Sequence, residues 1–313
     1  MPALRFLVAW LALACLTPSV SALPYDAVVI YGDSLSDNGN LFAVTTAIGQ
    51  PLPPSPPYYD GRRSNGPVAV EYLAQSLNAP LADFAWIGAT TGIGNYGDKG
   101  TVTTLGGLNL PGMTTTYDAT KSLLTPYLSN GLFIVWGGAN DLLAPSPLDS
   151  GIGINIINRA VANEVAIITD LQIMGAKTIL APGMLDLGLT PYFISQGSQK
   201  AAEATAFSDI FNATLMAALP SDVLYFDTAG LMRQVVNNPA AYGFTNWTGV
   251  CFDGVTVCSQ QAEYVFFDDF HPTTASHAIL AQGFYAAVVP EPYIVLMLLT
   301  GGAWLLAWLR KTA

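Results

Sequence analysis

A serine that directly follows a predicted buried strand is the first candidate for chemistry in this chain of 313 residues. Residues 27–31 form an apolar run rich in β-branched side chains, which predicts a buried strand. Residues 32–37 read Gly-Asp-Ser-Leu-Ser-Asp and must turn the chain sharply, leaving Ser34 near the carboxyl edge of a sheet. Ligands bind at that edge in open α/β sheets, so Ser34 is a candidate nucleophile.

A serine nucleophile needs a base to accept its proton, and the chain contains two histidines, His271 and His277. His271 follows Asp268 by three residues, so the carboxylate can bind one ring nitrogen while the other faces Ser34. His277 could compete as the base, but it lies within a predicted helix at 273–288, where we interpret it as structural. The pattern predicts Ser34 as nucleophile, His271 as base and Asp268 as the orienting acid.

Ester hydrolysis by a serine also needs donors that stabilise the negatively charged oxygen of the intermediate. Asn140 follows the apolar run 132–136, which places its side-chain NH at the same sheet edge as Ser34. Gly88 has no Cβ, so its backbone NH can approach a substrate closely. We expect an oxyanion hole formed by the amides of Ser34 and Gly88 and the side chain of Asn140. Each motif alone often marks only a turn of the chain. Their order in the sequence and their placement after strands favour a catalytic site.

The elements that position these residues alternate between strand and helix patterns. Apolar β-rich runs recur at 27–31, 132–136, 178–181 and 223–226, and helix-like stretches lie at 68–77, 154–174, 201–219 and 273–288. This alternation predicts an α/β fold with a parallel sheet covered on both faces. The Pro-rich stretch 51–59 is interpreted as a surface loop, and the Thr- and Gly-rich segment 90–120 as an insertion or lid-like loop.

The bulk composition limits the partners and cofactors. The chain is 51% hydrophobic and 11% charged, with a formal net charge of −11, so it offers no basic surface for nucleic acid. No metal or organic cofactor is expected. Cys251 and Cys258 lie in a polar segment without a second pair of metal ligands at suitable spacing, so we predict a disulfide between them.

Both ends of the chain carry the signature of export. Residues 1–22 have one basic residue, an apolar run and small residues ending at Ala22, the layout of a signal peptide. Residues 293–309 are almost entirely apolar and precede two basic residues. Seventeen residues at about 1.5 Å each reach roughly 26 Å, the short limit for crossing a bilayer. The hydrolase domain is therefore expected at 23–289, between these segments.

The C-terminal segment 290–313 begins Pro-Glu-Pro and resembles the PEP-CTERM sorting tail of Gram-negative bacteria. That resemblance implies processing by an exosortase-type membrane enzyme, whereas a plain membrane anchor is the alternative. Either interpretation predicts an exported protein of the cell envelope or the extracellular space, held at least transiently in the membrane by its C-terminal helix.

Taken together, the motifs resemble the GDSL esterase/lipase group of the SGNH-hydrolase superfamily. The blocks are residues 32–37, Gly88, Asn140 within Gly-x-Asn-Asp, and Asp268-x-x-His271. The resemblance implies a three-layer α/β/α sandwich with a mostly parallel, flavodoxin-like sheet, and hydrolysis of carboxylic esters through an acyl-enzyme. The absence of a Gly-x-Ser-x-Gly elbow disfavours the larger α/β-hydrolase fold.

Residues 58–62 and 64–67 also resemble a segment typical of one secreted branch of the group. The chain departs from that branch at Arg63, Ala69 and Ile87, so its substrate preference stays open. An acyltransferase or a carbohydrate O-acetyl esterase would use the same site, because water and an alcohol need the same base. A catalytically silent surface or matrix protein is the alternative of another class, and the intact set Ser34, Asn140, Asp268 and His271 argues against it.

Overall fold

The computed structural model describes residues 24–96, 104–105, 108–143 and 153–289. A five-stranded sheet lies at its centre, in the order β2-β1-β5-β6-β7. Each neighbouring pair in this sheet is parallel. The strands are β1 (Val28–Gly32), β2 (Leu81–Asp83), β5 (Leu132–Trp136), β6 (Thr178–Pro182) and β7 (Leu224–Phe226). Four of them overlap the predicted apolar runs; β2 has three half-buried residues and is too short to give a periodic signal.

Every residue of β1 and β5 is buried, which explains why their sequences are continuous apolar runs. Side chains alternate between the two faces of a strand. Val28 and Ile30 accordingly belong to one core cluster, and Val29 and Tyr31 to the other. A parallel sheet covered on both faces requires this pattern.

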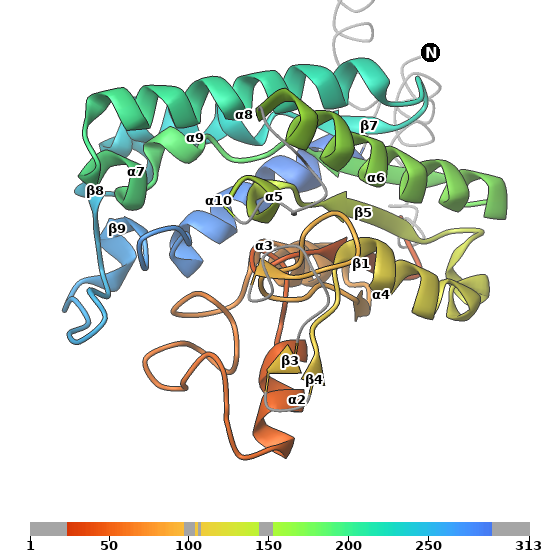
Figure 1. Cartoon of the computed structure of the whole chain (residues 1–313), viewed down its shortest axis with the longest axis horizontal. Helices are drawn as coiled ribbons and strands as arrows, with labels where there is room; N and C mark the ends of the chain where they lie inside the picture. The colour runs from red at the N-terminus through yellow and green to blue at the C-terminus, as the bar shows by residue number, and fades with distance from the viewer. Residues whose placement is uncertain (1–23, 97–103, 106–107, 144–152, 290–313) are drawn as a thin grey trace, which may run out of the picture.

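Helices cover both faces of the sheet and make the fold a three-layer α/β/α sandwich (Figure 1). One face packs against α3 (Ala69–Leu77), α9 (Thr228–Asn237) and α10 (Thr274–Val288), and the other against α4 (Met113–Thr120) and α6 (Gly153–Met174). Helix α8 (Ser198–Ala218) packs on α6. The predicted fold class is confirmed.

Shorter elements connect these layers. They are α2 (Asn40–Ala47), α5 (Ala139–Leu143), α7 (Pro191–Ser195), β3 (Thr104–Leu105), β4 (Leu108–Asn109), β8 (Asn246–Val250) and β9 (Tyr264–Phe266). Short 3₁₀ helices lie at Lys121–Leu123, Thr125–Tyr127, Leu187–Leu189, Pro239–Tyr242 and Gln261–Glu263. In Figure 1, α6 and α8 cross the upper part of the view, whereas α2 and the β3–β4 pair project below.

The expected loop at 90–120 was wrong in its second half, where α4 forms. Helix α4 is rich in threonine, which has a modest helix propensity. Met113, Thr116 and Tyr117 are nevertheless buried at helical spacing against the sheet. Tertiary packing on this face therefore outweighs the local preference.

The sheet order places the predicted site at a topological switch point. Counting the five sheet strands along the chain turns the order into 2-1-3-4-5, the flavodoxin-like arrangement. The order reverses beside β1 and β5, and these two strands are neighbours over their full length. Ser34 follows β1 and Asn140 follows β5, so both lie where ligands bind in this architecture.

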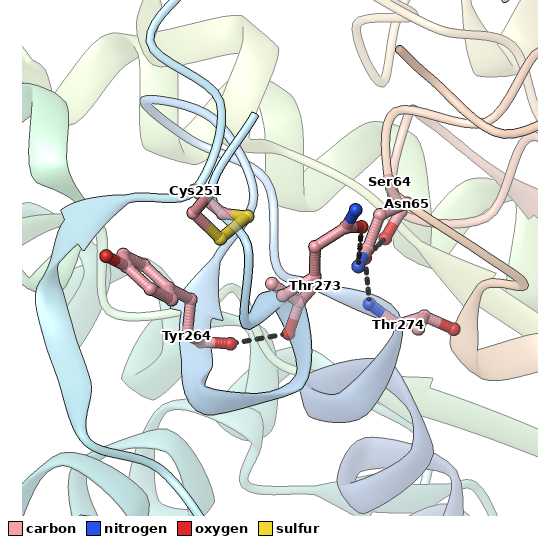
Figure 2. Close-up of a disulfide and its surroundings, with 8 residues drawn as sticks. Ser64, Asn65, Cys251, Tyr264, Thr273 and Thr274 are labelled. Atoms are coloured by element: carbon pink, nitrogen blue, oxygen red, sulfur yellow. Dashed lines mark hydrogen bonds between the residues drawn. A yellow bond between two sulfur atoms is a disulfide. The ribbon is translucent and has the colours of Figure 1, made fainter. Parts of the chain in front are cut away.

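The predicted disulfide between Cys251 and Cys258 is present, with an S–S distance of 2.06 Å (Figure 2). It lies between β8 and β9, and the Cys251 amide donates to the carbonyl of Phe266 at 3.1 Å. Figure 2 also shows the Thr273 hydroxyl donating to the Tyr264 carbonyl, at 2.7 Å. The disulfide-bearing segment therefore packs beside the connection from β9 to α10, which carries His271.

Among the described residues, no helix combines the length and the apolar character that a bilayer span needs. The predicted signal peptide at 1–22 and the predicted tail at 290–313 lie outside the described residues.

Candidate active site

Ser34 lies on a tight turn at the end of β1. A carboxylate oxygen of Asp33 accepts the amide of Leu35 at 3.0 Å, and the Asp33 carbonyl accepts the amides of Ser36 and Asp37 at 3.1 and 2.9 Å. Gly32 begins this turn in close contact with β5, because a Cβ there would lie 2.8 Å from the Trp136 carbonyl oxygen. The turn places Ser34 on the wall of a pocket, with 8% of its surface exposed.

The structure brings His271 and Asp268 to Ser34 from the far end of the chain. The Nε2 atom of His271 lies 2.9 Å from Ser34 Oγ. Its Nδ1 atom lies 2.7 and 2.9 Å from the two carboxylate oxygens of Asp268. An imidazole held between a hydroxyl and a carboxylate can accept the hydroxyl proton, while the carboxylate stabilises the resulting imidazolium.

Several donors hold Asp268 in its charged form. Burial alone would raise the pKa of this carboxyl group. Attraction to His271 and hydrogen bonds from His271, the Phe270 amide and the Tyr58 hydroxyl outweigh burial, so the pKa lies well below its ordinary value. Asp268 is therefore an anion across the pH range in which ester hydrolysis is measured.

His277 lies on α10 and is not among the residues that line the pocket. This position agrees with the interpretation of His277 as a structural residue. Its side chain is buried, and its Nδ1 atom accepts the Ala69 amide at 3.2 Å. Burial, with a smaller effect of nearby His271, lowers the pKa of His277 to about 3. The ring is therefore neutral and joins α10 to the start of α3.

Ser34 and Gly88 both line the pocket, and within the described parts of the chain neither of their amides donates a hydrogen bond. Gly88 has a φ of +79°, and a Cβ at this position would collide with the side chain of Asn95. The loop around Gly88 is held on both sides. The Ile87 amide donates to Asp37 Oδ2 at 2.8 Å, and Asn95 Nδ2 donates to the Ile87 carbonyl at 2.9 Å.

Asn140 also lines the pocket, but its side-chain NH₂ group is engaged by protein acceptors. Its Nδ2 atom donates to the Ala89 carbonyl at 3.0 Å and lies 3.4 Å from Asp33 Oδ2. The next residue, Asp141, is fully buried and accepts the amide and hydroxyl of Thr91 at 2.8 and 2.9 Å. The Gly-x-Asn-Asp motif therefore fixes the loop that follows Gly88 as well as presenting Asn140.

Asp33 and Glu164 are further carboxyl groups that lie buried around this site. Burial raises the pKa of Asp33 to about 6, against hydrogen bonding from the Leu35 amide and attraction to His271. Burial, with repulsion from Asp141, raises the pKa of Glu164 well above its ordinary value. The Oε1 atom of Glu164 accepts the Gly137 amide at 3.1 Å, and its Oε2 atom has no partner among the described residues.

Tyr58 is a site residue that the sequence analysis missed. Its hydroxyl donates to Asp268 Oδ2 at 2.7 Å, and its side chain is buried. It lies near the end of the Pro-rich stretch 51–59, which was interpreted as a surface loop. The proximity of Tyr58 to Asp268 joins residues 210 positions apart, and no local pattern signals such a contact.

The pocket at Ser34 is mostly apolar and has a volume of about 190 Å³. Its apolar lining consists of Leu35, Ile87, Tyr96, Trp136, Leu143, Met184, Leu185, Leu187 and Phe270, among others. Arg63 and Ile87, two departures from the resembled branch, line this pocket, whereas Ala69 is buried in the core at the start of α3. No group of His, Cys, Asp and Glu arranged to hold a metal occurs among the described residues.

The fold and these contacts define an α/β protein with a serine–histidine–aspartate arrangement at the switch point of its sheet. Residues 28–284 match the family of GDSL-like lipases and acylhydrolases, and the chain belongs to that family. The relationship places it among the ester hydrolases.

Individual relatives are similar at low identity. A phosphatidylcholine-sterol acyltransferase of Aeromonas hydrophila is 29% identical over 80% of this chain and 73% of its own length. A GDSL esterase/lipase of Arabidopsis thaliana is 27% identical over 86% of this chain and 87% of its own length. An uncharacterized Pseudomonas putida protein from the trpE-trpG intergenic region is 26% identical over 95% of this chain, which spans 54% of that protein. An acetylxylan esterase structure from Geobacillus stearothermophilus aligns with a TM-score of 0.46 and 13% identity, over 85% of this chain and 95% of that one.

Proposed function

We propose that the protein hydrolyses carboxylic esters with Ser34 as nucleophile, His271 as general base and Asp268 as the residue that orients the imidazole. The observation that carries this proposal is the pair of contacts made by His271, 2.9 Å to Ser34 Oγ and 2.7 Å to Asp268 Oδ1. They are the two contacts that proton transfer from the serine needs.

The reaction has two halves. Ser34 Oγ attacks the ester carbonyl and transfers its proton to His271 Nε2; the tetrahedral intermediate then collapses, and His271 returns the proton to the departing alcohol. In the second half, His271 takes a proton from water, and the hydroxide attacks the acyl group on Ser34. The second tetrahedral intermediate then collapses: the bond between the acyl carbon and Ser34 Oγ breaks, His271 returns the proton to Oγ, and the carboxylic acid leaves. Asp268 remains ionised throughout and stabilises the imidazolium in both halves.

The proposed oxyanion hole consists of the amides of Ser34 and Gly88 and the side chain of Asn140. The two amides have no protein acceptor among the described residues, which leaves them free for a substrate oxygen. Asn140 would turn its NH₂ group from the Ala89 carbonyl toward that oxygen as charge develops. Removing one such donor typically costs about 10²–10³ in kcat, so Asn140→Ala should show a loss of that order.

The decisive experiment compares the protein with Ser34→Ala on p-nitrophenyl esters from acetate to palmitate. We expect turnover that Ser34→Ala abolishes, labelling by a fluorophosphonate, and a preference for short or medium acyl chains, which suit a pocket of about 190 Å³. Turnover that does not depend on Ser34, or an absence of both turnover and labelling, would refute the proposal and favour the catalytically silent alternative.

Acyl transfer to an alcohol is the second candidate, because it uses the same acyl-enzyme. The A. hydrophila relative, named as an acyltransferase, is the observation that favours it. A carbohydrate O-acetyl esterase would also use the same residues. Product analysis with and without added sterol, glycerol or sugar acceptors distinguishes these outcomes, because transfer yields a new ester and hydrolysis yields only the free acid.

We further propose that the protein is exported from a Gram-negative cell, with residues 1–22 removed and residues 290–313 serving as a membrane-anchoring sorting tail. The sequence of both segments supports this, and so does the Cys251–Cys258 disulfide, since disulfides persist mainly outside the cytoplasm. Mass spectrometry of the protein from membrane and extracellular fractions tests it. An intact C-terminus in the membrane indicates an anchor, cleavage near residue 290 indicates an exosortase-type partner, and an intact N-terminus in the cytoplasm contradicts export.

A further inference from the structure

Arg63 lines the active-site pocket, and no carboxylate of the described residues forms an ion pair with it. Its Nη1 atom donates to the Tyr58 hydroxyl at 3.2 Å, and its guanidinium lies 5.1 Å from the centre of the Tyr58 ring. Its Nε atom is buried and has no hydrogen-bond partner among the described residues. The three other arginines of the described chain, Arg62, Arg159 and Arg233, each form an ion pair with a carboxylate.

This unpaired cation stands out in a chain with a formal net charge of −11. Burying part of a guanidinium is unfavourable unless another group supplies hydrogen bonds or opposite charge. Its planar set of N–H donors matches the paired oxygens of a carboxylate or a phosphate. Among the described residues, Arg63 reaches a carboxylate only indirectly, through the Tyr58 hydroxyl to Asp268, and it forms no direct ion pair. An anionic ligand is therefore the direct partner that its chemistry fits.

The loop that carries Arg63 is attached to the segment that carries His271. The Tyr58 hydroxyl binds Asp268, and the Ser64 hydroxyl donates to the Pro272 carbonyl at 2.9 Å. The Asn65 side chain accepts the amide of Thr274 at 2.8 Å, a contact drawn in Figure 2. These contacts come from both sides of Arg63. The loop therefore holds the guanidinium at Tyr58, which binds the carboxylate partner of His271, and Arg63 and His271 line the same pocket.

The position next to His271 indicates which part of an ester Arg63 would meet. His271 returns its proton to the departing alcohol, so the alcohol portion of the substrate must lie on the side of the imidazole. The oxyanion donors belong to a separate group of hydrogen bonds, which joins the Gly88 loop to Asp37 and Asn140. Arg63 is therefore placed to contact the alcohol portion rather than the carbonyl oxygen.

We propose that Arg63 is a specificity-determining residue that binds a carboxylate or phosphate on the alcohol portion of the ester, so that the enzyme prefers anionic esters. This inference rests on the proposed ester hydrolysis. The apolar remainder of the pocket receives the acyl group, and Arg63 supplies the charged contact.

The test measures kcat/KM of the full chain on matched acetate esters. Phenyl acetate is the neutral reference, 4-acetoxybenzoate carries a carboxylate on the alcohol portion, and 4-acetoxyphenyl phosphate carries a phosphate there. Phenyl hydrogen succinate carries its carboxylate on the acyl portion. For each variant, kcat/KM on an anionic ester is divided by kcat/KM on the neutral ester, and this ratio is compared with the wild-type ratio. The comparison cancels the intrinsic reactivity of the leaving groups.

Arg63→Gln should lower this ratio roughly tenfold to hundredfold for 4-acetoxybenzoate or the phosphate, since one charge-assisted contact is lost. The ester with the larger loss identifies the preferred anion. Arg63→Lys should recover part of the ratio, and added salt should weaken the preference of the wild type. Lys177→Gln, which removes an exposed cation elsewhere, is the control and should leave the ratio unchanged.

Three results would overturn the proposal. Equal losses on the neutral and anionic esters would mean that Arg63 only supports Tyr58 and Asp268. Unchanged kcat/KM on every ester would mean that Arg63 does not contact the substrate, and a loss confined to phenyl hydrogen succinate would place the anion on the acyl side. The turnover of phenyl acetate by Ser34→Ala tests the proposed function separately, because turnover that persists in this variant would refute ester hydrolysis by Ser34. Circular dichroism of each Arg63 variant verifies that it is folded.

Discussion

Asp268 gathers four donors on one carboxylate: the His271 ring, the Tyr58 hydroxyl, and the backbone amides of Phe270 and His271, which lie 3.0 and 2.8 Å from Oδ1. Two of these are backbone amides of the same turn and are set by the local chain. The Tyr58 hydroxyl comes from a distant loop and occupies Oδ2. It therefore limits rotation of the carboxylate and fixes the direction from which His271 is held.

Tyr58→Phe should lower kcat about tenfold, because a hydrogen bond to a charged group is lost while the ring packing is kept. Steady-state kinetics on p-nitrophenyl acetate tests this, with KM expected to change much less than kcat. Tyr59→Phe is the matched control, since Tyr59 is 43% exposed and is not in the pocket lining. Equal effects of the two variants would contradict a positioning role for Tyr58.

Glu164→Gln should make the stability of the protein less sensitive to alkaline pH. Burial raises the pKa of Glu164 above its ordinary value of 4.5, so the folded state holds the proton more tightly than the unfolded chain does. Its contribution to stability is complete below pH 4.5 and is lost as the pH rises through the folded-state pKa. Over that range the variant should gain about 1.4 kcal/mol relative to wild type per pH unit.

Urea denaturation at pH 5, 6.5 and 8 measures this difference. Glu203→Gln on α8 is the exposed control, and it should not show a rising advantage with pH. A Glu164→Gln effect that is constant across the three pH values would show that Glu164 ionises normally in the folded protein.

At the scale of elements, Asp37 joins the turn after β1 to the loop after β2. Its Oδ1 atom accepts the amides of Gly39 and Asn40 at 2.7 and 2.6 Å, and its Oδ2 atom accepts the Ile87 amide at 2.8 Å. One buried carboxylate therefore begins α2 and positions the residue before Gly88. Asp37 therefore joins the turn that holds Ser34 to the loop that holds Gly88, a proposed oxyanion donor.

Asp37→Asn should impair both activity and stability, because an amide retains one acceptor oxygen where the carboxylate has two. Losing one or two buried hydrogen bonds to a charged acceptor should cost about 2–4 kcal/mol of unfolding free energy. Urea denaturation together with kcat measures both effects. Ser36→Ala, within the same turn, is the control for a small side-chain change, and a stable but inactive Asp37→Asn would identify positioning of Gly88 as the dominant role.

At the scale of the whole molecule, the sequence predicts the parts that local pattern determines. Fully buried strands such as β1 and β5 must be apolar throughout, so four of the five sheet strands could be located from their apolar runs. The scarcity of histidine and the Asp268–His271 spacing restricted the choice of base. Helix α4 and strand β2 were missed because packing on the sheet, rather than their own sequence, stabilises them.

The contacts of Tyr58 and Arg63 were beyond prediction for a related reason. Both residues lie in a loop whose path depends on two hydrogen bonds with the segment after His271: the Ser64 hydroxyl donates to the Pro272 carbonyl, and the Asn65 side chain accepts the Thr274 amide. These contacts span more than 200 positions of sequence, so only the assembled fold reveals them. The same contacts attach this loop to the catalytic segment and place Arg63 in the pocket lining.

The distance along the chain between Ser34 and His271 has a consequence for when activity first arises. The two residues are 237 positions apart, and the segment holding His271 follows the last strand, β9. A chain emerging from a ribosome or a membrane channel therefore carries its nucleophile early and its base late. The chain should lack esterase activity until His271 reaches Ser34, so recovery of ester turnover after dilution from denaturant reports the closing step of folding.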